Sequence, residues 1–445
     1  MRIDSLEVKG LYGHLNFKKR FHPYLNFLIG INGSGKTSAL NVLAWTLFPS
    51  FRRLAALEFD EIRIKYSTQR QRREKIELVA KRLKSHIELT ISSEREPLLV
   101  PIFELAPEYL AESRERPSSL SEMYERFTAD QKDNLVLKSL KDLTGPLYLP
   151  LDRRWEQEPQ EPRPLRRYYG TSYYRGARYV HTGVIGPVLY LAEKYYRERQ
   201  SELNKLNEDI RERIVASAFD RATSVPQRIS QPWTAKKVRT IKEKTLKGLQ
   251  ETGIQVPTET VSKYFVRLEK IAKALEKKKI EPDRPAPKAF IEWIMNRPQI
   301  QWIEDIIQRI DEFNKQKENS LARIESFLQS VNSFLRDSNK QVAFDASGEI
   351  FVQMGGGHEI KADNLSSGET QLLTLFAYLY FAFPEQQEFV VMIDEPELSL
   401  HPQWQHQYVT SLAKANPNVQ FILATHSPEI VQQYKSFCIE MTLGK

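Results

Sequence analysis

Short runs of alternating hydrophobic and polar residues predict strands at the start of the chain. Residues 3–9, 14–19 and 24–29 are such runs, and a glycine or a proline separates each from the next. The third run leads into a glycine-rich segment, after which the apolar residues of 38–48 recur at helical spacing. The pattern therefore predicts a strand, a glycine loop and a helix in that order.

Three further alternating runs, residues 57–66, 74–83 and 86–92, predict an antiparallel β layer beside this helix. From about residue 100 to 335 the pattern changes to long charged helices with proline punctuation, which indicates a mostly α-helical insert. Within it, the apolar residues of 265–275 recur over two heptads, as in a short coiled coil. A single helix over residues 299–335 would be about 55 Å long at 1.5 Å per residue.

Regular α/β sequence returns after the insert. Residues 341–345 and 350–354 predict a β-hairpin, and the apolar run 372–383 predicts a buried helix. Residues 389–394 and 419–425 are almost continuously apolar, which is typical of strands buried in a parallel sheet. The expected domains are an N-terminal lobe of residues 1–95, a basic helical insert of residues 96–335 and a C-terminal lobe of residues 336–445.

Composition narrows the class of protein. A chain of 445 residues, 41% hydrophobic and 27% charged, is expected to form two or three soluble domains. Its longest strongly apolar run is shorter than the roughly 20 residues that a membrane-spanning helix needs. The first ten residues carry charges where a signal peptide needs an apolar segment, and the single cysteine excludes an internal disulfide. We therefore expect a cytoplasmic protein.

The net charge of +8 is distributed unevenly along the chain. It is +5 over residues 1–150, +12 over 151–290 and −9 over 291–445. The basic middle fits either contact with nucleic acid or a solvated helical surface. Within it, the Tyr- and Arg-rich residues 166–179 fit either base stacking or a protein interface.

The strongest chemical motif is GINGSGKT at residues 30–37, which matches the phosphate-binding pattern G-x-x-x-x-G-K-[ST]. Its glycines let backbone N–H groups face phosphate oxygens, and the following helix directs its positive end at them. Lys36 is expected to reach the β- and γ-phosphates, and the Thr37 hydroxyl is expected to bind Mg²⁺. The expected phosphate-binding residues are Asn32, Gly33, Ser34, Gly35, Lys36 and Thr37.

A second motif is the apolar run 389–393 that ends in Asp394 and Glu395. At the carboxyl end of a buried parallel strand, Asp394 can hold Mg²⁺ and Glu395 can polarise the water that attacks the γ-phosphate. An acidic strand end is common by itself. Because an intact phosphate loop precedes it in this chain, we favour the catalytic interpretation.

Three further motifs carry a family resemblance. Residues 365–369 (LSSGE) resemble the signature motif of ABC-type ATPases, and residues 425–428 (THSP) resemble their switch histidine. Together with residues 395–402 (EPELSLHP), they resemble the branch that contains the SMC, RecF-like and OLD-like ATPases. The resemblance covers residues 1–95 and about 335–430. It implies an α/β head, a mixed sheet flanked by helices with an antiparallel β subdomain, that binds ATP and Mg²⁺.

The resemblance also implies a role for each matching residue. Two heads meet head to tail, so that Ser366 and Gly368 of one copy reach the γ-phosphate held by the other. Asp394 is the metal partner, Glu395 the catalytic base and His426 the sensor of the γ-phosphate. Ser399 and His401 lie in the loop that contacts the second head, and the glutamine loop of the family stays unassigned between Gln69 and Gln71.

The resemblance extends to the ATPases of bacterial anti-phage systems such as PARIS and Septu, including an LPxxRR-like segment at residues 149–154. It implies a homo-oligomeric ATPase that controls a separate effector, such as a Toprim or HNH nuclease, in response to a phage-encoded trigger. Only residues 427–445 follow His426, which leaves no room for a Toprim domain. The alternative is a DNA-repair or chromosome-maintenance ATPase that binds DNA through the insert.

Overall fold

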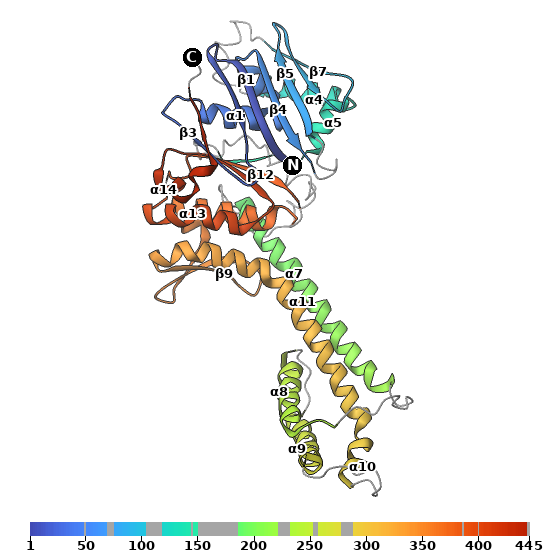
Figure 1. The fold of residues 1–445 in the computed structure, drawn as a ribbon. Coiled ribbons are helices and arrows are strands. Elements are labelled where there is room, and N and C mark those ends of the chain that lie inside the picture. The colour runs from blue at the N-terminus through green and yellow to red at the C-terminus, as the bar shows by residue number, and fades with distance from the viewer. Residues whose placement is uncertain are drawn as a thin grey trace. The chain divides into compact units, whose positions relative to one another are not determined.

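The computed structural model describes eleven stretches of the chain: residues 1–48, 50–68, 75–103, 118–143, 146–149, 186–220, 232–251, 257–276, 288–384, 387–398 and 400–442. The chain divides into two compact units (Figure 1). One contains Met1–Ala192 and Phe327–Lys445, and the other is Glu193–Ser326. No helix among the described residues is both long and apolar enough to cross a bilayer.

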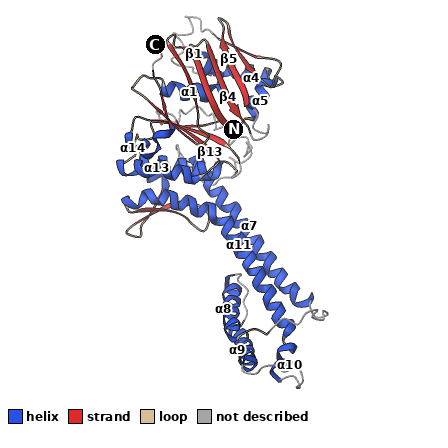
Figure 2. Cartoon of the chain, viewed as in Figure 1, coloured by secondary structure: helices blue, strands red, loops and turns tan. Residues whose placement is uncertain are grey.

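An antiparallel sheet of six strands, in the order β2-β1-β4-β5-β6-β7, forms one layer of the first unit. Its strands are β1 (Arg2–Leu11), β2 (Leu15–Arg20), β4 (Glu61–Ser67), β5 (Lys75–Arg82), β6 (His86–Ile91) and β7 (Leu98–Pro101). Alternate side chains are buried, which confirms the predicted β layer. They pack on α1 (Lys36–Leu47), which lies across one face of the sheet (Figures 1 and 2).

A parallel sheet of five strands, in the order β14-β3-β13-β12-β8, forms the second layer. Its strands are β3 (Leu25–Ile29), β8 (Leu147–Leu149), β12 (Phe389–Asp394), β13 (Val419–Ala424) and β14 (Cys438–Glu440). Every residue of β12 and β13 is buried, as their continuous apolar sequence predicts. The α/β fold class is thus confirmed, with the parallel and antiparallel strands in separate sheets.

The register of the parallel sheet brings three strand ends together. Asp394 at the end of β12 pairs with Ala424 of β13, and Ala424 pairs with Leu28 of β3. The glycine loop follows β3, and Thr425 and His426 follow β13. Because parallel strands point the same way, all three loops emerge at one edge of the sheet.

Helices and a small sheet complete this unit. The predicted hairpin is present as β9 (Lys340–Phe344) and β10 (Ile350–Met354), and β11 (Glu359–Lys361) pairs with the other edge of β10. The buried apolar run forms α12 (Ser367–Ala377) and continues as the π-helix η5 (Tyr378–Ala382). The remaining elements are α2 (Phe51–Ala56), α4 (Ser118–Asp130), α5 (Leu135–Asp142), α13 (Pro402–Ala415), α14 (Pro428–Val431), η3 (Arg336–Ser338), η4 (Ala362–Asn364) and η6 (Gln432–Phe437).

The second unit is helical in the part that the structure describes. Its helices are α7 (Gly186–Asp220), α8 (Ala235–Glu251), α9 (Thr258–Glu276), α10 (Lys288–Met295) and α11 (Arg297–Leu335), the first and last of which begin or end in the other unit. The predicted apolar stripe of α9 packs into a core with Trp233 and Trp293. The helix expected over residues 299–335 is confirmed as one continuous helix of 39 residues, α11. Gly248 of α8 meets Ile310 so closely that an added Cβ would lie 2.6 Å from its side chain.

The insert is shorter than the expected span of residues 96–335. The described elements between β6 and residue 149 belong to the first unit. Val136, Leu137 and Leu140 of α5 complete the core under the antiparallel sheet, and β8 pairs with β12. α5 and β8 belong to the first unit because they pack into its core and its sheet. The compact helical unit is therefore Glu193–Ser326.

Candidate nucleotide-binding site

The glycine loop leaves no space for a side chain at its first position. A Cβ added to Gly30 would lie 2.6 Å from the Met441 carbonyl oxygen and 2.7 Å from the Ser34 hydroxyl oxygen. At the other end of the loop, Gly35 adopts φ 91°, a left-handed conformation that glycine accepts without strain. The backbone at the start of the loop is thus packed too closely for any residue larger than glycine.

The first N–H groups of α1 have neither a side-chain cap nor an acidic residue beside them. Gly35 is the N-cap of α1, no side chain caps the helix, and no acidic residue lies in its first turn. The first N–H groups of a helix lack intrahelical partners and carry the positive end of the helix dipole. A phosphate group is the ligand that such a loop and helix start favour.

Lys36 lies within this loop and is only 5% exposed. Its Nζ donates hydrogen bonds to the carbonyl oxygens of Gly30 at 3.0 Å and Ile31 at 3.1 Å. Burial lowers the pKa of Lys36, and the nearby carboxylates of Glu395 and Asp394 oppose that shift. The ammonium group is therefore held at the loop by weak neutral acceptors that a phosphate can replace.

Thr37 and Asp394 meet across the edge of the parallel sheet. The Thr37 hydroxyl donates a hydrogen bond of 3.2 Å to Oδ1 of Asp394. Asp394 is 2% exposed, and burial raises its pKa to about 6. Its Oδ2 and the buried Ser34 hydroxyl have no hydrogen-bond partner among the described residues.

These unsatisfied oxygens fit a bound Mg²⁺ and its phosphate. Magnesium is usually held by one or two protein oxygens together with phosphates and waters. Within the described stretches no group of three or more His, Cys, Asp or Glu forms a complete metal site. Thr37 and Asp394 would supply the protein part of such a shared site, with phosphate and water as its other ligands.

Glu395 directly follows β12 in an unusual conformation. Its φ is 46°, and its N–H donates to the Ala424 carbonyl oxygen at 2.8 Å. A left-handed conformation is unfavourable for a residue other than glycine, and such residues concentrate at functional sites. The side chain is half-buried, and its charge acts on Lys36.

Glu397 organises the site, although its motif alone gave it no role. Its carboxylate accepts hydrogen bonds from the N–H groups of His426 at 2.7 Å and Ser427 at 3.1 Å, and from the Thr425 hydroxyl at 2.8 Å. The loop after β12 is therefore fastened to the loop after β13. His426 itself is exposed at this edge.

The signature segment forms a rigid helix start. Ser366 is the N-cap of α12 and forms a capping box with Glu369, whose carboxylate accepts the Ser366 N–H at 2.8 Å. The buried Glu369 also pairs with Lys340 at 2.9 Å and accepts from the Ser338 hydroxyl at 3.0 Å. Burial opposes ionisation of Glu369, but these hydrogen bonds outweigh it and lower its pKa.

The structure thus separates the expected site residues into two groups. The phosphate loop, Asp394, Glu395 and His426 lie at one edge of the parallel sheet. Ser366 is exposed and Gly368 is buried at the start of α12, and the polar contacts of Ser366 are with Glu369 and Thr370. Several other residues lie outside the described part of the chain, namely Gln69, Gln71, Arg153, Arg154, Ser399 and residues 166–179.

Comparison with protein families finds one matching model. Residues 272–432 match the family described as "AAA domain, putative AbiEii toxin, Type IV TA system". The matched segment contains the signature, Asp394, Glu395 and His426, while the phosphate loop lies ahead of it.

Several curated proteins and solved structures are similar to this chain, among them the following two proteins and one structure. The retron Vc95 probable ATPase of Vibrio cholerae is 31% identical over 29% of this chain and 27% of that protein. The Septu protein PtuA of Bacillus thuringiensis is 29% identical over 32% of this chain and 36% of that protein. The chain thus covers well under half of either relative. The Smc head domain of Pyrococcus furiosus aligns over 100% of this chain and 94% of that chain, with a TM-score of 0.42 and 13% identity.

The family match and the two curated relatives agree with the geometry of the sheet edge. One α/β unit contains a glycine loop before a helix, a buried strand that ends in Asp394 and is followed by Glu395, and a capped helix at the signature segment. The chain is therefore similar to ABC-type ATPases of the branch to which defence ATPases and SMC-like heads belong.

Proposed function

We propose that this protein binds and hydrolyses ATP with Mg²⁺ and acts as the switch subunit of a prokaryotic anti-phage system that controls a separate effector. The observation that carries the ATPase assignment is the hydrogen bond between Thr37 and Asp394 beside the phosphate loop. It joins the two motifs that the chemistry needs, although 357 residues separate them in the sequence.

The phosphate loop would bind the nucleotide by exchanging internal contacts for phosphate contacts. Lys36 would release the carbonyl oxygens of Gly30 and Ile31 and donate to the β- and γ-phosphates. Thr37 and Asp394 would hold Mg²⁺ between them. When bound, Mg²⁺ neutralises the charge that develops on the phosphate oxygens during hydrolysis.

Glu395 and His426 are the candidates for the hydrolytic step. Glu395 would accept a proton from the attacking water and orient it towards the γ-phosphate. Glu397 would act as a positioning residue, since it fastens the backbone of His426 to the strand that carries Glu395. His426 would then report the presence of the γ-phosphate.

Metal binding should depend on pH through Asp394. Its pKa of about 6 means that the carboxyl is ionised at pH 7 and about 90% protonated at pH 5. Because a metal binds only the carboxylate, we expect the affinity of the ATP complex for Mg²⁺ to fall about tenfold from pH 7 to pH 5, with proton release below pH 6. Calorimetry in buffers of different ionisation enthalpy measures both.

The variant Asp394→Asn is the control for this pH effect. It keeps the size of the side chain, cannot titrate and should bind Mg²⁺ weakly at every pH between 5 and 7. An affinity of the wild-type protein that stays constant over this range would show that Asp394 does not hold the metal.

We further propose that two heads associate head to tail, so that the signature of one completes the site of the other. The exposed Ser366 at a capped helix start supports this arrangement, because the one hydrogen bond that its hydroxyl makes with described residues is long, 3.4 Å from the Glu369 N–H. Gly368 behind it is buried and leaves the helix start compact.

The substitution Ser366→Arg should separate binding from turnover. A bulky cation would occupy the position that the γ-phosphate of the second head must approach, so we expect ATP affinity within about twofold of wild type and hydrolysis reduced at least tenfold. Phosphate release measured over a range of protein concentrations tests this. Ser347→Arg, on the exposed hairpin turn, is the matched control. Normal turnover that is independent of concentration would contradict a shared site.

The defence role is supported by the similarity to the retron and Septu proteins. The partners would be a second copy of the chain, an effector such as a Toprim or HNH nuclease and a phage-encoded trigger, and the expected location is the cytoplasm. Co-purification of the chain with the product of the neighbouring gene, followed by phage infection of cells that carry both, tests this role. Full protection by a variant that cannot bind ATP would refute it.

The alternative of direct DNA binding through the basic insert, residues 151–290, has weaker support in the described residues. α8 carries six Lys or Arg residues and two Glu. Four of its cations already pair with carboxylates of the helical unit, as in Arg239 with Glu269 at 2.7 Å. Lys277, Lys278 and Lys279 of the insert lie outside the described residues.

A further inference from the structure

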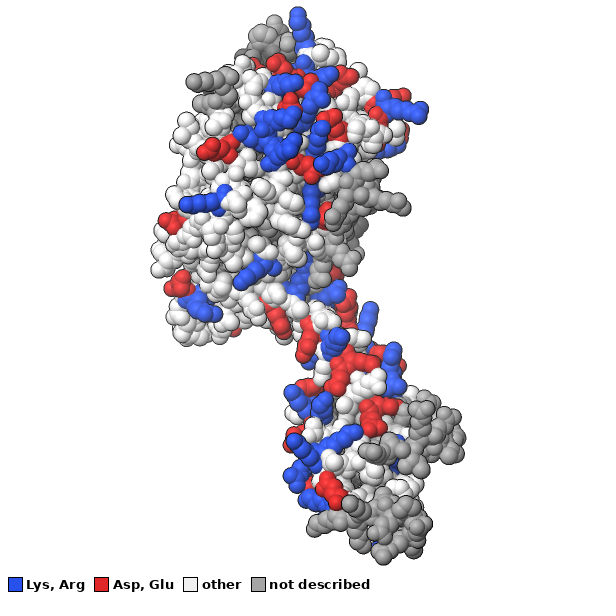
Figure 3. Space-filling model, viewed as in Figure 1, with Lys and Arg blue, Asp and Glu red and all other residues white. Residues whose placement is uncertain are grey.

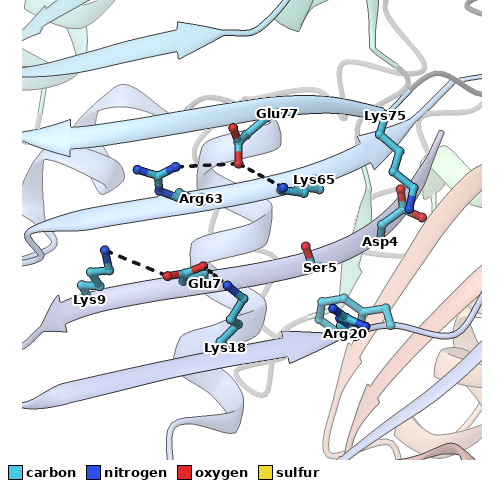
Figure 4. Close-up of a pocket in the computed structure, with 11 residues that line it drawn as sticks. Asp4, Ser5, Glu7, Lys9, Lys18, Arg20, Arg63, Lys65, Lys75 and Glu77 are labelled. Atoms are coloured by element: carbon cyan, nitrogen blue, oxygen red, sulfur yellow. Dashed lines mark ion pairs between the residues drawn. The ribbon is translucent and has the colours of Figure 1, made fainter.

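The outer face of the antiparallel sheet carries a half-open hollow of about 710 Å³ on the strands β1, β2, β4 and β5 (Figure 4). This face is opposite to the one on which α1 packs, since its side chains alternate with the buried ones. The hollow is lined by Asp4, Ser5, Glu7, Lys9, Lys18, Arg20, Phe21, Arg63, Lys65, Lys75 and Glu77. Six of these residues are basic and three are acidic.

In one half of this face, the basic and acidic side chains of neighbouring strands form ion pairs with one another. Glu7 lies opposite Lys18 on β2 and opposite Arg63 on β4, and Lys18 pairs with it at 2.7 Å. Glu61 pairs with both Lys9 and Arg63. These cross-strand pairs stabilise the sheet and leave little net charge.

The other half has more cations than carboxylates. Ser5 of β1 lies between two cations on the neighbouring strands. Arg20 lies opposite it on β2, and Lys65 lies opposite it on β4. Arg20 is exposed and has no carboxylate partner among the described residues. In the described part of the sheet, Lys65 pairs with Glu77, which also pairs with Arg63.

Lys75 adds a third cation at this end. It is exposed and faces Asp4, whose carboxyl is more than half-buried; burial raises the pKa of Asp4, and the charge of Lys75 opposes that shift. Arg20, Lys65 and Lys75 thus form an excess of positive charge around the Ser5 hydroxyl, which we name the sheet cation row. Figure 3 shows Lys and Arg side chains gathered over this part of the molecule.

We propose that the sheet cation row binds the phosphate backbone of duplex DNA. Its members stand on β2, β4 and β5, so they spread over about 10 to 15 Å at roughly 4.8 Å per strand instead of converging on one point. A row of that length suits several phosphates of a backbone better than one small anion. The exposed side chains can follow a backbone, and the Ser5 hydroxyl can donate to a phosphate oxygen. This surface is separate from the ATP site and goes beyond the proposed function.

The experiment compares binding of a fluorescent 30-base-pair duplex of mixed sequence by the full-length chain and its variants. In Arg20→Ser/Lys65→Ser/Lys75→Ser we expect affinity at low salt to fall at least tenfold. The slope of log K against log salt should become shallower by about 2 to 3, because each phosphate contact contributes about 0.9. The charge-preserving variant Arg20→Lys/Lys65→Arg/Lys75→Arg should retain binding.

A matched control removes three positive charges from the helical unit instead. Lys236→Ser/Lys242→Ser/Lys247→Ser changes the net charge equally, and its duplex affinity should stay within twofold of wild type. ATP affinity should be unchanged in both Ser variants, which shows that the head is folded. Unchanged affinity and slope in the sheet variant, or a loss confined to the α8 variant, would overturn the proposal. Inorganic phosphate is added at the same concentration as the phosphate groups of the duplex. If it displaces the duplex, the assignment to a nucleic-acid backbone is overturned.

Discussion

Lys36→Ala should reduce ATP affinity by roughly 100-fold, because a charge-assisted contact to the phosphates is worth up to about 3 kcal/mol. Among the described residues the ammonium group donates to the carbonyl oxygens of Gly30 and Ile31 and forms no ion pair, so its removal breaks no described ion pair. We therefore expect the fold to survive while nucleotide binding is lost. Calorimetric titration with ATP and Mg²⁺ measures the change.

Lys361→Ala is the matched control for this variant. Lys361 is an exposed lysine of β11 in the same unit, so its loss changes the net charge equally without touching the loop. It should bind ATP like the wild-type protein. Thermal unfolding of both variants without nucleotide separates a lost contact from a lost fold. Wild-type ATP affinity in Lys36→Ala would refute the assignment of the phosphate site.

The sequence was most informative where a function depends on neighbouring residues. The phosphate loop is a local motif, and its strand and helix follow from adjacent periodic runs, so α1 and β3 were predicted within about two residues. β12 and β13 were predicted because both faces of a central parallel strand are buried, which makes the sequence continuously apolar.

The sequence was least informative where a role depends on contacts between distant segments. Glu397 acts on residues after β13, and Glu369 pairs with Lys340, so neither role can be seen in its own motif. β8 and β14 have three residues each, too few to show a period, and both exist because they pair with longer strands. The same cause explains the boundary of the insert, since α5 folds with a core formed by earlier residues.

The conformation of Glu395 adds an argument about its role that motif matching cannot supply. A residue with φ 46° would be replaced by glycine at little cost if the backbone alone mattered. A glutamate in this conformation is instead expected where its carboxylate is needed, and its charge acts on Lys36 within the same site. The strain and the charge together favour a catalytic interpretation over a simple acidic end of a strand.

Glu395→Gln should therefore bind ATP and fail to cleave it. The amide keeps the size of the side chain and the backbone conformation but cannot accept the proton of the attacking water, so we expect turnover to fall about 100- to 1,000-fold with ATP affinity unchanged. The ATP-bound state should accumulate, and with it any oligomer that ATP stabilises. Phosphate release and oligomer mass in the presence of ATP measure these two effects.

Comparing Lys36→Ala with Glu395→Gln tests whether the output depends on the nucleotide-bound state or on ATP hydrolysis itself. Lys36→Ala should show no ATP-dependent binding of its partner. Glu395→Gln should stay in the ATP-bound state, so that the effector is either permanently released or permanently bound. Glu359→Gln, an exposed glutamate of β11, provides the matched control and should behave as wild type in phage protection and cell toxicity. Wild-type hydrolysis by Glu395→Gln would eliminate this residue as the base, and equal cellular behaviour of the two variants would mean that ATP turnover, and not the nucleotide-bound state, produces the output.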